Sequence, residues 1–181
     1  MKPIIKEGVR ILRPFEFNIL LNAIPKLDHQ IQLKTLLFTG MRYAECKTFF
    51  NKPEWLEQDF IHLPSTKKKA RQRERWIRLN PRGKEVVQHC LSLKKGLPHR
   101  VTWYENLHRW IKDANLQDTG MSIKTTRKTW ESWLLFYYPS HQIHIMQSQG
   151  HSDVVSFKHY LNMPFNDEDK IHMKQFVEGW I

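Results

Sequence analysis

A small set of side chains in this sequence is of the types that bind and attack phosphate. Arginine holds two phosphate oxygens at once because its guanidinium is planar and always charged. Histidine and lysine donate protons or hydrogen bonds, and a phenol becomes a nucleophile as it loses its proton. These types stand in short segments at Arg42, Lys124, Arg127, His151 and Tyr160. Together they are suited to breaking a phosphodiester.

The basic residues of the chain are concentrated between positions 67 and 84, where Glu74 is the single acid. The cations of this run are Lys67, Lys68, Lys69, Arg71, Arg73, Arg75, Arg78, Arg82 and Lys84. The whole sequence has 29 Lys and Arg against 18 Asp and Glu, a formal net charge of +11. So dense a run favours contact with nucleic acid over a basic face that only meets solvent.

Other classes of protein fit the sequence poorly. Its length of 181 residues suits one domain with a full core. No apolar run approaches the roughly 20 residues of a spanning helix, and no signal-peptide pattern opens the chain. Cys46 and Cys90 are expected to be buried thiols in a reducing cytoplasm. His141 and His144 would share a helix face, but no Cys or Glu completes a metal-binding set, so we expect no metal and no cofactor.

The order and spacing of four segments resemble the tyrosine recombinase (phage integrase) family. Residues 36–45 resemble its first conserved box, a hydrophobic run, then Thr-Gly-x-Arg, then an acid three residues on. Residues 124–129 resemble the second box, His or Lys followed three residues later by Arg. Gly150-His151 matches the third segment, and Tyr160 stands nine residues after the histidine, where the family keeps its nucleophile. The basic run occupies the place of the family's lysine hairpin.

The resemblance covers residues 11–161 and includes two departures. Lys124 stands where most bacterial members have His, and Gln149 stands where Leu is usual. Lysine in the second box is similar to the integrases of archaeal spindle-shaped viruses (fuselloviruses). The family's N-terminal core-binding domain has no counterpart here, so residues 1–181 are expected to be a catalytic domain, either a fragment or a naturally shortened form.

The resemblance implies roles for the residues that match. Arg42 and Arg127 would stabilise the phosphorane, and Tyr160 would form a covalent 3′-phosphotyrosyl bond. Lys69 is the first choice for the general acid, with Lys67 and Lys68 as alternatives. His151 would donate a hydrogen bond to phosphate. Lys124 would do the same or assist proton transfer, and Glu45 would support Arg42. The candidate DNA-binding residues are Lys67, Lys68, Arg71, Arg73, Arg75 and Lys128.

The implied function is site-specific recombination of double-stranded DNA at attachment sites, by an integrase that assembles as a tetramer on DNA. Its work would be viral genome integration in the cytoplasm of a host cell. Two alternatives stay open: a DNA-relaxing enzyme like the type IB topoisomerases, and a basic DNA-binding module without catalysis. Tyr160 could also be a packing tyrosine, and His151 a histidine that only satisfies a helix end.

The elements that must position these residues are mostly helical. Helical spacing predicts a helix from Pro14 that stops before Pro25, a second that ends at Gly40, and a third that ends at Phe50. Further helices are predicted to start at Asn80-Pro81 and end at Gly96, and to start at the caps Thr102, Ser122, Ser140, Ser152 and Asn166. Trp130 and Trp133 are interpreted as core residues rather than as a base-stacking platform.

Two short β-prone pieces interrupt the helices. Phe60–Leu63 and residues 76–79 are predicted to pair in a small antiparallel sheet. The expected fold class is therefore α+β, mostly α-helical, with the tyrosine recombinase core and a three-stranded antiparallel sheet. The last helix carries too many apolar residues to be free in solvent. It either packs on its own domain or, with Pro164 as a hinge, docks on a neighbouring protomer.

Overall fold

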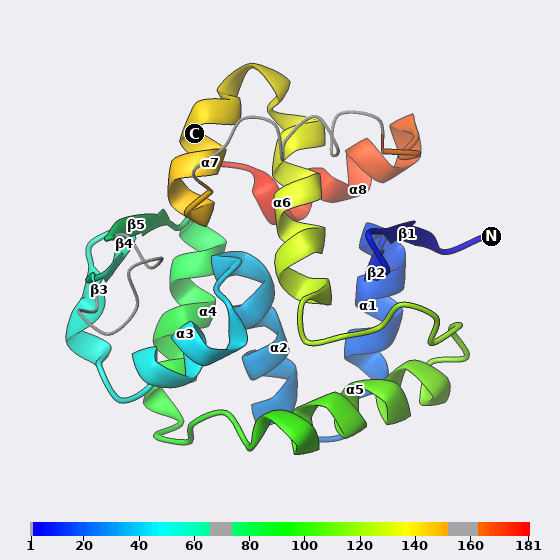
Figure 1. Ribbon diagram of the computed structural model, residues 1–181, viewed down its shortest axis with the longest axis horizontal. Helices are drawn as coiled ribbons and strands as arrows, with labels where there is room; N and C mark the ends of the chain where they lie inside the picture. The colour runs from blue at the N-terminus through cyan, green and yellow to red at the C-terminus, as the bar shows by residue number, and fades with distance from the viewer. Residues whose placement is uncertain (1, 66–73, 152–162) are drawn as a thin grey trace.

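The computed structural model describes residues 2–65, 74–151 and 163–181. It is mostly helical with two small antiparallel sheets, which confirms the expected fold class (Figure 1). The helices are α1 Pro14–Ala23, α2 Leu27–Thr39, α3 Tyr43–Phe49, α4 Pro81–Ser92, α5 Arg100–Asp113, α6 Thr125–Tyr137, α7 Gln142–Gln149 and α8 Asp167–Val177, with short 3-10 turns at Pro53–Trp55 and Pro139–His141. The strands are β1 Ile4–Lys6, β2 Val9–Ile11, β3 Leu56–Glu57, β4 Phe60–Leu63 and β5 Arg75–Arg78.

Most helix ends lie where local chemistry places them. Pro14 and Pro81 each occupy the first turn of a helix, where the missing N–H costs nothing. The Asn80 side chain caps α4 by accepting from the Gly83 amide at 2.8 Å. Asn166 caps α8 in the same way, accepting from the Asp169 amide at 2.8 Å.

Four helix boundaries differ from the prediction. α7 begins at Gln142, after the 3-10 turn Pro139–His141, and not at Ser140. α4 ends at Ser92 instead of continuing to Gly96, and Lys94 already has a φ of 51°. α5 begins at Arg100, ahead of Thr102, with His99 accepting from the Val101 amide at 3.4 Å. α6 begins at Thr125, and Ser122 contributes by accepting from the Lys124 amide at 3.1 Å. The predicted helix after Ser152 lies outside the described residues.

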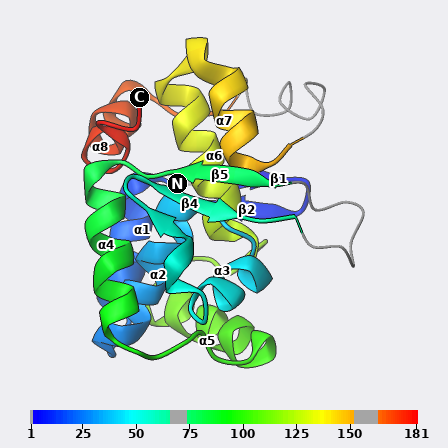
Figure 2. The ribbon, with the colours of Figure 1, turned by 90° about the vertical axis from the view of Figure 1, so that its left-hand side faces the viewer.

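The sheet β3-β4-β5 confirms the predicted pairing. Its strands are antiparallel, with Ile61 opposite Ile77 and His62 opposite Trp76. Ile61 and Ile77 are fully buried, whereas the Trp76 side of the sheet is exposed. β5 also runs alongside α7, which links the sheet to the helical part of the molecule (Figure 2).

The hairpin β1–β2 was not predicted. Ile4 pairs with Ile11, and the turn uses Glu7 and Gly8, both with positive φ (48° and 72°). A two-residue hairpin turn needs this conformation and is usually signalled by Asn-Gly or Asp-Gly. Glu-Gly gives a weaker signal. The hairpin packs against α6, which carries two of the predicted site residues.

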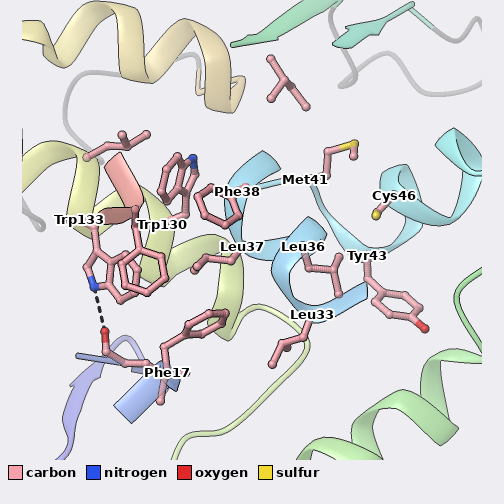
Figure 3. Close-up of a cluster of buried hydrophobic side chains, with 14 of the residues drawn as sticks. Phe17, Leu33, Leu36, Leu37, Phe38, Met41, Tyr43, Cys46, Trp130 and Trp133 are labelled. Carbon is pink, nitrogen blue, oxygen red and sulfur yellow. Dashed lines mark hydrogen bonds between the residues drawn. The ribbon is translucent and has the colours of Figure 1, made fainter. Parts of the chain in front are cut away.

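The core forms around α6 and α2. Trp130 and Trp133 are fully buried, which confirms them as core residues. Trp130 meets Phe38 of α2 edge-on at 5.5 Å between ring centroids, and Trp133 meets Phe17 of α1 at 6.1 Å (Figure 3). The indole of Trp133 donates to the Leu12 carbonyl at 2.9 Å. Cys46 and Cys90 are buried free thiols, as predicted.

The C-terminal helix packs on its own domain. Phe176 is 3% exposed, Val177 and Trp180 are fully buried, and the Trp180 indole donates to the Arg78 carbonyl at 3.1 Å. Asn80 fixes the same segment by donating to the Phe176 carbonyl at 2.7 Å. In the single protomer α8 therefore packs in cis, and docking of the same segment on a neighbouring protomer stays a prediction. Within the described residues, no helix is long and apolar enough to cross a membrane.

Candidate active site

A cleft of about 470 Å³ opens between the start of α3, the start of α6 and His151, which lies two residues after the end of α7. Four of the predicted catalytic residues line it: Arg42, Lys124, Arg127 and His151. Lys128, a predicted DNA-binding residue, lines it as well. Segments distant in sequence therefore bring their cations to one place.

Arg42 is held at the start of α3 by Glu45. The backbone amide of Arg42 donates to one Glu45 carboxylate oxygen at 2.8 Å, and its guanidinium donates to the other at 2.7 Å. This arrangement is a capping box, because Glu45 is the third residue of the helix. The Arg42 side chain is still 51% exposed. Its guanidinium therefore has an ordered direction and a free side toward the cleft.

Glu45 is also bound by Arg75 of β5. The two terminal nitrogens of Arg75 donate to the two carboxylate oxygens of Glu45 at 2.9 and 2.7 Å. Burial would raise the pKa of Glu45, but the hydrogen bonds and charge of Arg75, together with Arg42, lower it to about 2. Glu45 is thus a carboxylate at neutral pH and supports Arg42.

The position of Arg75 differs from its predicted DNA-binding role. Arg75 is only 6% exposed, and both terminal nitrogens face Glu45. A buried charge needs a paired partner, and the strand alternation turns this residue inward next to Ile77. In this structure the Arg75 guanidinium binds Glu45 in the interior and does not face solvent.

Arg127 is anchored by two main-chain carbonyls. One terminal nitrogen donates to the Gly40 carbonyl at 2.7 Å, and the other donates to the Gln149 carbonyl. Both oxygens lie at the C-terminal ends of helices, α2 and α7, where the helix dipole is negative. Burial lowers the pKa of Arg127 to about 10, an effect that Glu131 opposes. Arg127 therefore stays charged at neutral pH although it is only 8% exposed.

Two glycines let the chain pack closely at this site. Gly40 has a φ of 57°, and a Cβ there would lie 2.4 Å from the Gln149 side-chain oxygen. Gly150 has a φ of 69°, and a Cβ there would lie 2.7 Å from Cδ of Arg75. Both positions need the left-handed backbone and a missing side chain. The Thr-Gly-x-Arg and Gly-His patterns thus have a physical basis in this fold.

His151 follows Gly150 and reaches toward α6. Its Nε2 atom lies 3.5 Å from Arg127 and 2.6 Å from Oε1 of Glu131. Glu131 is only 1% exposed and was not singled out from the sequence. The available signal was its spacing, because a residue four positions after Arg127 lies on the same helix face.

Lysines complete the cationic lining of the cleft. Lys124 is the exposed N-cap residue of α6, and Lys128 forms an ion pair with Glu7 in the turn of the β1–β2 hairpin. Lys47 of α3 and Arg100 of α5 also line the cleft and were not predicted. The described part of the chain contains no group of three or more His, Cys, Asp or Glu side chains placed to hold a metal ion.

Six predicted site residues fall in segments 66–73 and 152–162, outside the described residues. They are Lys67, Lys68, Lys69, Arg71, Arg73 and Tyr160. Their roles stay predictions. The described neighbours on either side, β4 and β5 for the first segment and His151 for the second, lie in the sheet and at the cleft.

The sequence matches no protein-family model and no curated protein sequence. Solved structures do match. A XerA recombinase is 18% identical with a TM-score of 0.67, over 93% of this chain and 65% of that chain. The XerH site-specific recombinase bound to palindromic difH substrate, in a post-cleavage complex, is 17% identical with a TM-score of 0.65, over 97% and 54%.

A pre-cleavage complex of XerH with difH substrate is 19% identical with a TM-score of 0.60, over 83% of this chain and 49% of that chain. This chain therefore spans between about half and two thirds of the length of the structures it matches. At such low identity the match concerns the fold. Together with the helices and the three-stranded sheet described above, it shows that the chain has the catalytic-domain fold of the tyrosine recombinases.

Proposed function

We propose that this chain is the catalytic domain of a site-specific tyrosine recombinase that cleaves and rejoins double-stranded DNA. The observation that carries the proposal is that Arg42, Lys124, Arg127 and His151 line one cleft. They come from three segments that are distant in sequence, and like charges repel one another, so packing alone does not explain four basic side chains in one cleft. Binding of a polyanion would offset the repulsion among these positive charges.

Arg42 and Arg127 would stabilise the transition state. Attack on a phosphodiester builds negative charge on the equatorial oxygens of a phosphorane, and guanidiniums already fixed in place lower its energy without reorganising. Glu45 orients the first arginine, and the carbonyls of Gly40 and Gln149 orient the second. His151 would add a hydrogen bond to a phosphate oxygen.

The nucleophile would be Tyr160, which leaves a 3′-phosphotyrosyl bond and a free 5′-hydroxyl. The phenol loses its proton as it attacks, and the departing 5′-oxygen gains one. Lys69 would supply the proton that the 5′-oxygen gains, with Lys67 and Lys68 as alternatives in the same run. Lys124 would contact phosphate or assist proton transfer. Rejoining reverses these steps, so the enzyme acts as a DNA strand transferase.

The substrate would be double-stranded attachment-site DNA. The XerH structures are complexes with difH substrate, which supports a DNA partner for this fold. The basic residues Lys67, Lys68, Arg71, Arg73 and Lys128 would contact the backbone. We further propose that protomers assemble as a tetramer on DNA in the host-cell cytoplasm, and that the enzyme integrates a viral genome, as its similarity to the integrases of archaeal spindle-shaped viruses implies.

The test is covalent trapping on a nicked suicide substrate, which releases a short fragment and so prevents rejoining. Wild-type protein is expected to form a protein–DNA adduct that resists denaturation. Arg42→Gln and Arg127→Gln should each slow adduct formation by about 100-fold or more while most DNA binding remains. Binding without any adduct would favour the non-catalytic module, and adduct formation by protomers that do not assemble on DNA would favour a topoisomerase-like enzyme.

A further inference from the structure

Two cations of the cleft have no role in the scheme above. Lys47 of α3 and Arg100 of α5 line the cleft beside the proposed catalytic residues, and both are exposed. Neither side chain forms an ion pair or a hydrogen bond with another residue in the described part of the chain. Lys128, by contrast, is paired with Glu7. The charges of Lys47 and Arg100 are therefore available to a ligand.

The cleft offers these two cations no counter-charge at its surface. Glu131 is the one carboxylate among the described residues that line it, and it is 1% exposed and lies 2.6 Å from His151. Like charges that share a cleft without an acid repel one another. An anion that extends from α3 to α5 would offset this repulsion, and a polyanion extends far enough to do so.

The relative positions of the two cations are fixed by a buried contact between their helices. Tyr43, the first residue of α3, is 5% exposed, and its hydroxyl donates to the Pro98 carbonyl at 2.9 Å. Its ring also packs against Trp103 of α5, at 6.0 Å between ring centroids. Arg100 is the first residue of α5 and follows Pro98 by two positions. The start of α5 is thus held against α3, and Arg100 and Lys47 belong to one ordered surface.

The spacing along α3 fits neighbouring phosphates of a DNA strand. Arg42 is the N-cap of α3, and Lys47 stands five residues later on the same helix. Five residues of α-helix rise about 7.5 Å, whereas the phosphates of one strand of B-DNA follow one another at about 3.4 Å along the axis. That offset matches a flanking phosphate better than the phosphate that Arg42 would hold.

We propose that Lys47 and Arg100 form a second phosphate-binding subsite, which holds the backbone of the duplex beside the phosphate that is attacked. The inference rests on the proposed function for its partner, double-stranded DNA, and adds contacts on α3 and α5 to the basic residues predicted from the sequence. Contacts to phosphate fix the register of a protein on the duplex and do not depend on base sequence. Both side chains act here through their charge, and no proton or bond is transferred through them.

The test is the salt dependence of DNA binding. Fluorescence anisotropy would measure the affinity of the wild-type protein, Lys47→Ala and Arg100→Ala for a short labelled duplex, between about 50 and 200 mM salt. Each lost phosphate contact should reduce the slope of log affinity against log salt by about 0.9. Over this range of salt, the ratio of wild-type affinity to variant affinity should therefore fall about 3.5-fold. Arg100→Lys keeps the charge and should keep the wild-type slope.

The matched controls are Arg109→Ala and Lys52→Ala. Each removes one exposed cation close in sequence to the proposed subsite, Arg109 on α5 and Lys52 just after α3, and neither residue lines the cleft. Both controls should keep the wild-type slope. An equal reduction in the controls would mean that net charge alone is responsible, and it would overturn the proposal.

An unchanged slope in either Lys47→Ala or Arg100→Ala would also overturn it. Repetition with a second duplex of unrelated sequence should give the same reductions, and reductions that depend on the sequence would show base contacts in place of a phosphate subsite. The binding assay requires no cleavage. If wild type binds DNA but forms no covalent adduct, the proposed function fails, and the slopes still decide whether Lys47 and Arg100 bind phosphate. If wild type forms the adduct and the slopes do not change, only the subsite is wrong.

Discussion

At the scale of single residues, the arginines of the cleft are held by specific partners. Glu45 binds Arg42, and the carbonyls of Gly40 and Gln149 bind Arg127. Arg42, Lys124, Arg127 and His151 were predicted from motif spacing, and the structure brings them together. The contacts that hold these side chains could not be predicted from the sequence because they depend on tertiary packing. Arg75 looked like one more cation in a basic run, and only the inward side of β5 shows that it is buried against Glu45. Glu131 looked like an ordinary helix residue.

The Glu45–Arg75 pair makes stability depend on pH. The pKa of Glu45 is lowered to about 2 in the folded protein, so its contribution is present above its unfolded pKa, about 4.3, and is lost as pH falls toward 2. The free energy of unfolding should therefore drop between pH 5 and pH 2, by an amount on the order of 3 kcal/mol from this group. Denaturant titrations of wild type and Glu45→Gln should show a smaller drop in the variant.

The exposed Glu178 provides the control for this prediction, because it pairs with Lys174 at 3.6 Å on the surface. Glu178→Gln should keep the wild-type dependence on pH. If Glu45→Gln instead loses as much stability on acidification as wild type does, the Glu45–Arg75 contact is not the source of the pH dependence of the free energy of unfolding.

At the scale of elements, helices were predictable where punctuation is explicit. α1 begins at Pro14, α2 ends at Gly40 and α8 begins after the Asn166 cap, and each of these residues acts through the local backbone. α4 ends before the predicted Gly96 because Lys94 already has a positive φ. α5 begins before the predicted Thr102 because His99 is its N-cap. Neither position is restricted to one residue type. The β1–β2 hairpin was missed because three-residue strands carry too little pattern.

The helix ends that hold Arg127 can be tested at Gly40. Gly40→Ala places a Cβ on a left-handed backbone and 2.4 Å from the Gln149 side chain, which is itself fully buried. We expect a loss of about 1–2 kcal/mol in the free energy of unfolding. In Gly96→Ala the new Cβ meets its nearest neighbour at 4.0 Å, and stability should change by less than about 0.5 kcal/mol. Equal effects of the two substitutions in a denaturant titration would contradict the account.

The packing of α8 in cis predicts unequal effects along one helix. Phe176 is 3% exposed and meets Phe17 at 5.7 Å and Trp133 at 5.0 Å between ring centroids, whereas Ile171 is 70% exposed. Phe176→Ala should cost about 3–5 kcal/mol in unfolding free energy. Ile171→Ala should cost less than about 0.5 kcal/mol.

Both changes should be measured by thermal unfolding of the protein without DNA. Similar small losses in the two variants would mean that α8 does not pack on its own domain in solution. A loss at Phe176 that appears only at high protein concentration would instead point to exchange between protomers.

At the scale of the whole molecule, a net charge of +11 and a cleft lined by arginine and lysine favour a polyanionic partner. The fold class could be predicted because motif order, helical spacing and a short sheet all agree with one architecture. The DNA sequence recognised could not, since groove contacts leave no fixed motif.

The proposed function depends on attack of Tyr160 on the phosphodiester. The most direct measurement is peptide mapping by mass spectrometry of the adduct trapped on a nicked suicide substrate. We expect the 3′-phosphate to be attached to Tyr160, and we expect Tyr160→Phe to bind DNA and form no adduct. Tyr104→Phe, which removes a hydroxyl from an exposed tyrosine of α5, should form adduct at the wild-type rate. An adduct that maps to another residue, or that persists in Tyr160→Phe, would contradict the account.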